Sequence, residues 1–167
     1  MIFSMTTFTF VHVVVSLVGI GSGLVVLAGL LAGKRCDGWT AVFLATTVAT
    51  SATGFGFPFF AFSPSHGVGI VSLVVLGVAI VARYAKHLAG AWRWIYAIGA
   101  VVALYLNVFV LIVQLFRKVP ALAAIAPTQS EPPFFVAQLL VMALFIWLGI
   151  AAVRRFHPEP TATTLRA

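Results

Sequence analysis

The stretch HVVVSLVGIGSGLVVLAGLLAGKR, residues 12–35, decides the fold class. It contains no Asp, Glu, Lys or Arg between His12 and Lys34, so it is long enough and apolar enough for a helix that crosses a bilayer. In lipid only helices and closed barrels satisfy all backbone hydrogen bonds, and this stretch lacks the alternating polarity of a barrel strand. It therefore predicts a transmembrane helix that ends at a pair of cations.

The rest of the chain repeats this pattern. Of its 167 residues, 62% are hydrophobic and 8% are charged, whereas an ordinary soluble domain carries about 25% charged residues. We predict an all-α integral membrane bundle of five helices, forming a single domain over residues 1–155. The polar tail, 156–167, is expected to be disordered. The predicted spans are 10–33, 39–62, 68–85, 92–116 and 134–153.

The formal net charge is +7. A strongly basic soluble protein would suggest nucleic-acid binding, but these cations lie between apolar runs, where they contact anionic lipid headgroups. We therefore expect the bilayer, and no nucleic acid, as a partner. Two of the ten cations, Arg117 and Lys118, follow the fourth span, and the other eight fall in the first and third loops and the tail. The positive-inside rule then predicts a cytoplasmic C-terminus and an N-terminus outside. The eight are Lys34, Arg35, Arg83, Lys86, Arg93, Arg154, Arg155 and Arg166.

Small and hydroxyl residues at helical spacing predict where the first two spans pack. The predicted packing residues are Ser16, Gly19 and Gly23 on the first span, and Thr46, Thr50 and Gly54 on the second. The glycine-rich runs GIGSG and GFGFPFF that overlap or follow these stripes lack the lysine of a phosphate-binding loop and the third glycine of a dinucleotide fingerprint. Helix packing is therefore the favoured interpretation of both stripes.

Every Asp, Glu, Lys and Arg falls in a loop or at a helix end, which argues against a proton pump, an ion-coupled transporter or a voltage sensor. Two histidines, His12 on the packing stripe and His66 in the short second loop, are both expected on the outer side. Neutral imidazoles can ligate a haem iron, or with Glu131 a divalent metal, and a histidine and a carboxylate can take protons from a quinol. The alternative is a structural His12 and an exposed loop His66.

Three amides lie inside predicted spans: Asn107 and Gln114 on the fourth, and Gln138 on the fifth. Amides in membranes bond neighbouring helices, at about 0.6 kcal/mol each. They could instead contact a bound headgroup or a quinone. Both interpretations stay open at this point.

The runs GWTAVFLATTVATSATGFGFPF, LAGAWRWIYAIGAVVALYLNVFVLIVQLF and APTQSEPPF resemble small uncharacterised polytopic inner-membrane proteins of Gram-negative bacteria. The resemblance covers roughly residues 10–155 and implies a location in the bacterial inner membrane, without an activity. A fainter similarity links the chain to small b-type cytochromes, which also have few helices and arginine collars. Those proteins place paired histidines well inside two helices, so we carry no haem ligands over.

Three functions remain as hypotheses. The favoured one is a non-catalytic accessory or structural membrane component, with no catalytic residue, that contacts other subunits or a second copy of itself through its helices. The second is a redox protein that binds haem b or quinone at the outer face with His12, His66 and Glu131. The third is a small-solute carrier along Thr46, Thr50, Asn107 and Gln114.

Overall fold

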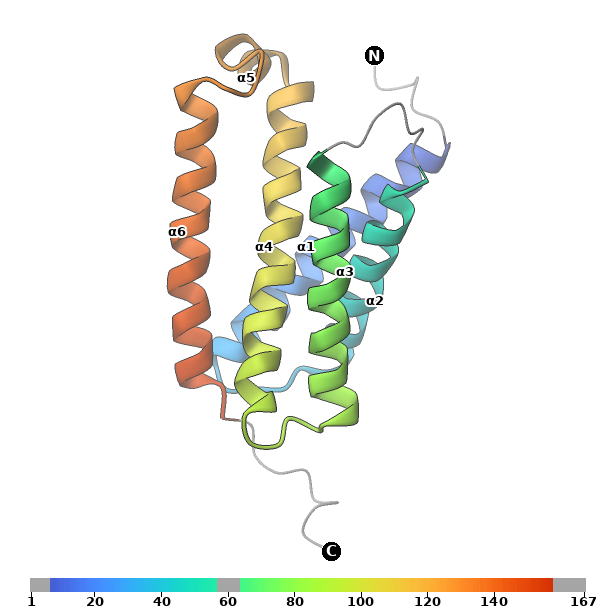
Figure 1. The fold of residues 1–167 in the computed structure, drawn as a ribbon, viewed down its shortest axis with the longest axis vertical. Coiled ribbons are helices and arrows are strands. Elements are labelled where there is room, and N and C mark those ends of the chain that lie inside the picture. Colours follow the sequence, from blue (N-terminus) through green and yellow to red (C-terminus); the bar gives the residue numbers. More distant parts are fainter. Residues whose placement is uncertain (1–6, 57–63, 158–167) are drawn as a thin grey trace, which may run out of the picture.

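The computed structural model describes residues 7–56 and 64–157, and within these ranges it consists of helices and turns without a strand (Figure 1). The predicted all-α class is therefore confirmed. The predicted tail lies outside the described residues beyond residue 157. The helices are α1 (Thr7–Leu31), α2 (Asp37–Gly54), α3 (Pro64–Ile80), the π-helix η1 (Val81–Ala85), α4 (Trp92–Lys118), α5 (Pro120–Ile125) and α6 (Pro132–Arg155).

Four described segments are long and apolar enough to cross a membrane: Thr7–Leu31, His66–Ala85, Trp92–Lys118 and Pro132–Arg155. They coincide with the first, third, fourth and fifth predicted spans, which fits a multi-pass membrane protein. The predicted span 39–62 coincides with α2 up to Gly54, and its last residues, 57–62, lie outside the described ranges. With its threonines, serine and glycines, α2 is less apolar than the other four.

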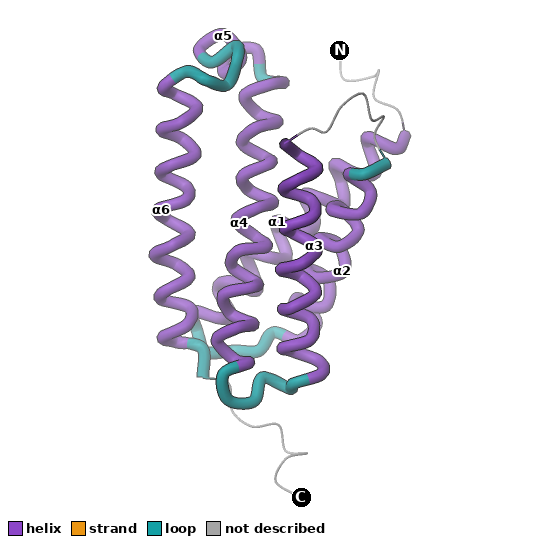
Figure 2. Tube along the Cα trace, viewed as in Figure 1, coloured by secondary structure: helices purple, strands orange, loops and turns teal. Residues whose placement is uncertain are grey.

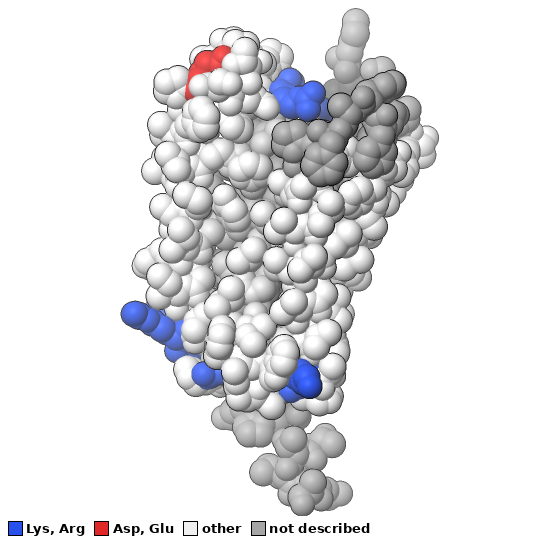
Figure 3. Space-filling view, in the orientation of Figure 1, with Lys and Arg blue, Asp and Glu red and all other residues white. Residues whose placement is uncertain are grey.

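Helix α4 is the centre of the bundle and contacts α1, α3, α5 and α6 (Figure 1). Helix α2 packs between α1 and α3, and the short α5 lies across one end of the molecule, between α4 and α6 (Figure 2). The loop between α1 and α2 lies at the opposite end, which we call the Asp37 end. On the face drawn in Figure 3, charged side chains gather at the α5 end and the Asp37 end, with an uncharged belt between them.

Glycines let α1 approach its neighbours closely. A Cβ at Gly23 would lie 2.6 Å from Leu104 Cδ1 and 2.9 Å from Phe43 Cδ2, so no larger residue fits without a shift. A Cβ at Gly19 would lie 3.2 Å from the Thr46 hydroxyl oxygen. Both glycines are buried, and Ser16, one turn before Gly19, is half-buried. Close approach of this kind replaces the hydrophobic effect as a source of stability between helices in lipid.

The buried face of α2 differs from the predicted stripe. Its buried residues are Thr40, Phe43, Leu44, Thr47 and Ser51, whereas Thr46, Thr50 and Gly54 are half-buried. The large side chains of Phe43 and Leu44, which are 0% and 3% exposed, set which side of the helix faces inward. Gly54 has no described atom within 4 Å of where its Cβ would be, so it makes no close approach to a described neighbour.

Candidate functional site

A cavity of about 860 Å³ lies among α1, α2, α3 and α4 at the α5 end of the bundle. Its volume falls in the range of about 300–1,000 Å³ that is usual for small-molecule sites. Most of its surface is apolar, as it is in such sites. The apolar side chains in its wall include Val13, Leu17, Ile20, Leu106, Val110 and Leu111.

The cavity brings together polar residues that are far apart in sequence. Five of the residues singled out from the sequence for ligand or solute contact line it: His12, His66, Thr50, Asn107 and Gln114. Ser16 and Thr50, predicted as packing residues, line it as well. Near the α5 end, the predicted packing stripes therefore face the cavity in addition to a neighbouring helix. Ser51 and Ser72 add a pair of hydroxyls 3.1 Å apart on the side of α2 and α3.

The orientation of His12 is fixed by a hydrogen bond to α2. Its Nδ1 lies 2.8 Å from the hydroxyl oxygen of Thr53. The Thr53 hydroxyl also lies 2.7 Å from the Ala49 carbonyl, and when it donates to that carbonyl, the imidazole Nδ1–H is the donor to Thr53. In the neutral ring this places the lone pair on Nε2, which is the arrangement of a histidine that accepts a hydrogen bond or ligates through Nε2.

His66 lies in a helix and not in a loop. The sequence pattern predicts a third span from Val68, but α3 begins at Pro64, since proline is well suited to the first helical position. His66 is therefore held in the first turn of α3, half-buried, with its ring centroid 5.9 Å from that of Phe55. Because its backbone is helical, the position of His66 in the cavity wall is more rigidly defined than that of a loop residue would be.

Asn107 and Thr50 supply polar groups deeper in the bundle. The Asn107 amide Nδ2 donates to the Thr47 hydroxyl at 3.2 Å, which ties α4 to α2. The Thr50 hydroxyl is buried and has no hydrogen-bond partner among the described residues. A buried hydroxyl without a partner costs about 1–3 kcal/mol.

Two cations line the cavity at its α5 end. Arg117 and Lys118 form the last turn of α4, and both are exposed. None of the described residues that line the cavity is acidic. The cavity thus combines apolar walls, a strip of neutral hydrogen-bonding groups and a cationic rim.

Glu131 and Gln138 do not join the other candidates. The Glu131 carboxylate accepts hydrogen bonds from the Thr128 backbone and hydroxyl, at 3.1 and 2.8 Å, and from the Ser130 backbone at 3.0 Å. Slight desolvation alone would raise the pKa of Glu131, but these hydrogen bonds outweigh it and hold the pKa below its usual value. Gln138 is buried and donates to the Phe109 carbonyl at 3.3 Å, which ties α6 to α4. Among the described residues no group of three or more His, Cys, Asp and Glu could hold a metal ion.

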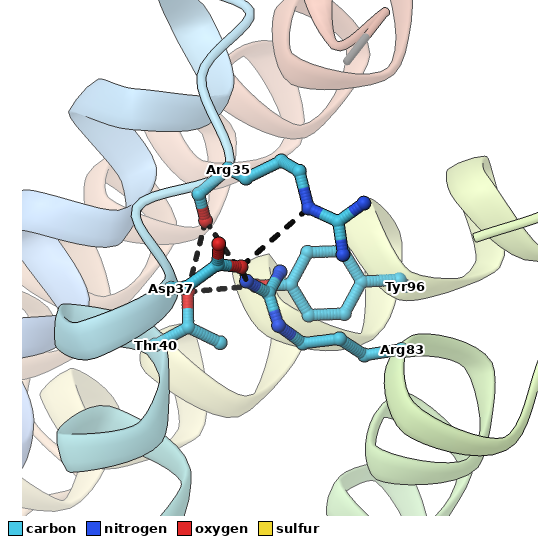
Figure 4. A network of polar contacts seen from close by, with 5 residues as sticks. All are labelled: Arg35, Asp37, Thr40, Arg83 and Tyr96. Atoms are coloured by element: carbon cyan, nitrogen blue, oxygen red, sulfur yellow. Dashed lines mark hydrogen bonds and ion pairs between the residues drawn. The ribbon is translucent and has the colours of Figure 1, made fainter. Parts of the chain in front are cut away.

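A polar cluster at the Asp37 end was not predicted from the sequence (Figure 4). The sequence pattern predicts Arg83 among loop cations that contact lipid headgroups, yet its side chain is only 2% exposed. Its guanidinium donates to the Arg35 carbonyl at 3.1 Å and pairs with the Asp37 carboxylate. It also lies 5.0 Å from the ring centroid of Tyr96, whose hydroxyl is 3.2 Å from that of Thr40.

This cluster joins the beginnings of α2 and α4 to the end of α3. Arg83 reaches it from the π-helix η1, whose wider turn ends in a hydrogen bond from Lys86 N to Val81 O at 2.9 Å. The sequence feature that could have indicated this cluster is Asp37, the one acidic residue within the cation-rich loops. Since the charged groups of the cluster contact one another across three elements, we assign it a structural role.

No protein-family model, no curated protein and no solved structure matches this chain. The case for a function therefore depends on the cavity and its lining.

Proposed function

We propose that the chain is a five-span protein of the bacterial inner membrane, with its N-terminus outside, that binds one amphipathic small molecule in the cavity among α1–α4. The observation that carries the proposal is the lining of that cavity. It combines apolar walls with His12, Thr50, Asn107 and Gln114 and has cations at its α5 end. A site for an amphiphile needs this division between an apolar and a polar part.

The course of the chain supports five spans. Helix α1 ends at the Asp37 end, whereas α3 begins at the α5 end, where His66 meets Phe55. The chain must therefore return between them, and α2 carries it back. Its 18 residues span roughly 27 Å at 1.5 Å per residue, close to the thickness of about 30 Å of a hydrocarbon core. Two of its hydroxyls donate to its own carbonyls, Thr46 to Val42 and Thr53 to Ala49, both at 2.7 Å, which lowers the cost of placing them in lipid.

The distribution of charge supports the orientation. Lys34, Arg35, Arg83, Lys86, Arg93, Arg154 and Arg155 all belong to the Asp37 end, whereas Arg117 and Lys118 belong to the α5 end. The positive-inside rule puts the more cationic end in the cytoplasm. The end of the bundle that holds the cavity then lies on the outer side.

Ligand binding explains the cavity better than the other hypotheses do. An accessory subunit that acts through helix contacts needs no hollow of this size, and that role remains a prediction. A carrier needs a path to the other face, but the Asp37 half is filled by the buried Phe43, Arg83 and Tyr96. A quinone fits the apolar walls and His12. The predicted histidine–carboxylate pair is not formed, however, because the Glu131 carboxylate binds Thr128 and Ser130.

The proposal is tested by asking what the purified protein carries. Gly54 lines the cavity and has open space at its Cβ, so Gly54→Phe should fill the cavity without a clash against described residues. Gly21 also has open space at its Cβ but is exposed on α1 and does not line the cavity, so Gly21→Phe is a matched control.

The measurement is mass spectrometry of the organic extract of each full-length protein, purified in mild detergent. We expect one lipophilic compound near one copy per chain in the native and Gly21→Phe proteins, and a loss of most of it in Gly54→Phe. Equal retention in all three, or no enriched compound in any, would overturn the proposal.

A further inference from the structure

We infer that the ligand of this cavity is a phosphate-bearing lipid whose phosphate lies at Arg117 and Lys118. The inference rests on the proposed function and names its ligand class. It excludes a neutral quinone and a free anion as the main ligand.

The first argument is the position of these two cations. Arginine and lysine are disfavoured on the outer side of inner-membrane proteins, and Arg117 and Lys118 are the two of the ten that the charge pattern assigns to it. Both line the cavity. Neither forms an ion pair within the described residues, where the ion pairs join Asp37 to Arg35 and Arg83. Their charge is therefore available to an anion at the α5 end of the cavity.

The second argument is the order of groups along α4. Asn107, Leu111, Gln114 and Lys118 recur at spacings of three and four, so they share one face of the helix, and all four line the cavity. From Lys118 inward, the amide of Gln114 lies roughly 6 Å deeper and Asn107 roughly 16 Å deeper, at 1.5 Å per residue. A lipid has the order of Lys118, Gln114 and Leu111: a phosphate, then ester carbonyls that accept from amides, then hydrocarbon. The Asn107 amide lies beyond this run and donates to Thr47.

The third argument is the chemistry of the rim. A guanidinium presents paired N–H donors that match the oxygens of a phosphate, and an ammonium adds a compact charge. With no acidic residue among the described lining, nothing there opposes an anion. A quinone has no charge for these groups to neutralise, whereas a soluble anion would leave the apolar walls unused.

Cations at the end of a helix also interact with its dipole, whatever binds nearby. Arg154 and Arg155 provide the matched control, because they too are an exposed pair in the last turn of a long helix, α6, and neither lines this cavity. Arg117→Gln/Lys118→Gln is therefore compared with Arg154→Gln/Arg155→Gln.

The experiment measures the affinity of the full-length protein for four probes in neutral detergent, by titration of the thermal unfolding midpoint. The probes are dioctanoyl phosphatidic acid, dioctanoylglycerol, decylubiquinone and inorganic phosphate. We expect phosphatidic acid to bind and dioctanoylglycerol, which has the same tails without the phosphate, to bind at least about tenfold more weakly, since one hydrogen bond to a charged group is worth about that factor.

The variants then locate the site. Arg117→Gln/Lys118→Gln should lose about tenfold or more in affinity for phosphatidic acid, and Gly54→Phe should abolish binding. Arg154→Gln/Arg155→Gln should stay within about twofold of the native protein, since its pair lies outside the cavity.

Three results would overturn the inference while leaving the cavity function intact. They are equal binding of dioctanoylglycerol, tighter binding of decylubiquinone, and an equal response to inorganic phosphate alone. An equal loss of affinity for phosphatidic acid in the two double-glutamine variants would also overturn the inference, because the loss would then reflect surface charge in general. If Gly54→Phe changes the binding of no probe, the proposed function itself fails.

Discussion

The Nδ1 atom of His12 lies 2.8 Å from the Thr53 hydroxyl, across 41 residues of sequence, and joins α1 to α2 beside the cavity. The Thr53 hydroxyl lies 2.7 Å from the Ala49 carbonyl as well, so it links the imidazole to the backbone of α2. Thr53 was not singled out from the sequence, because nothing in its spacing sets it apart from the other threonines of α2. It is a positioning residue for the ring that faces the proposed ligand.

We predict that Thr53→Val and His12→Ala act on the same interaction. Thr53→Val should lower the free energy of unfolding by about 0.5–1.5 kcal/mol, the usual value of one hydrogen bond. In the double variant the cost of removing that bond should appear once, so the two effects should be less than additive. Unfolding in mixed detergent micelles measures all three variants. Strict additivity would contradict the bond.

Gly23 should be the least replaceable glycine of α1. Gly23→Ala puts a Cβ 2.6 Å from Leu104 and 2.9 Å from Phe43, and overpacking of this kind costs about 1–3 kcal/mol. Gly21→Ala, two residues earlier, meets nothing within 4 Å and should be neutral or slightly stabilising, because alanine is the better helix former. The same unfolding assay compares them, and equal effects would mean that α1 packs with another face.

The hydropathy of the sequence was enough to find the helices, and the charges were enough to find the two ends. The face that each helix turns inward was harder, because apolar side chains in a membrane protein contact lipid as readily as a neighbouring helix. Thus Thr46 and Thr50 were predicted at the interface; Thr46 lies against Gly19 of α1, but the residues that the structure buries most deeply are their neighbours Thr47 and Ser51. The meeting of His12, His66 and Asn107 in one cavity depends on how α1, α3 and α4 cross, which the local spacing of residues does not encode.

The cluster at the Asp37 end predicts an asymmetry between two substitutions. Asp37→Asn leaves the Arg83 guanidinium, 2% exposed, without its carboxylate, and an unpaired buried charge costs about 3 kcal/mol or more. Arg83→Met leaves behind a carboxylate that is 70% exposed and still lies 3.5 Å from Arg35, so it should cost about 1–2 kcal/mol in lost hydrogen bonds.

The free energy of unfolding of both variants, and of the pair combined, checks this asymmetry. The combined variant should resemble Arg83→Met, because the charge that Asp37 neutralises is then gone. A larger effect of Arg83→Met than of Asp37→Asn would show that packing of the arginine stem on Tyr96 matters more than its charge.

Glu131 predicts a dependence on pH. Hydrogen bonds from Thr128 and Ser130 hold its pKa below the usual carboxyl value, so ionised Glu131 stabilises the folded state above the pKa of the unfolded chain. That stabilisation is lost as the pH falls through the lowered pKa of the folded state. The native protein should therefore have a higher thermal midpoint than Glu131→Gln at neutral pH, and the difference should vanish in acid. A difference in thermal midpoint between the two proteins that does not change with pH would contradict this prediction.

The proposed orientation predicts which terminus meets the cytoplasm. A green fluorescent protein fused after residue 167 should fluoresce, and alkaline phosphatase at the same position should be inactive, because the C-terminus is then inside. Alkaline phosphatase inserted at Pro127, between α5 and α6, should be active. The opposite pattern would invert the molecule and place the end of the bundle that holds the cavity on the cytoplasmic side.

The π-helix η1 also has a geometric consequence. In an α-helix each residue turns the chain by about 100°, so the wider turn between Val81 and Ala85 acts as one residue more than the α-helical path requires. Loss of one residue from this turn would return it to α-helical geometry and leave one residue fewer to place Arg83 between α3 and the loop that leads to α4. The place of Arg83 beneath α2 is thus specified by a count of residues along the backbone as much as by the guanidinium itself.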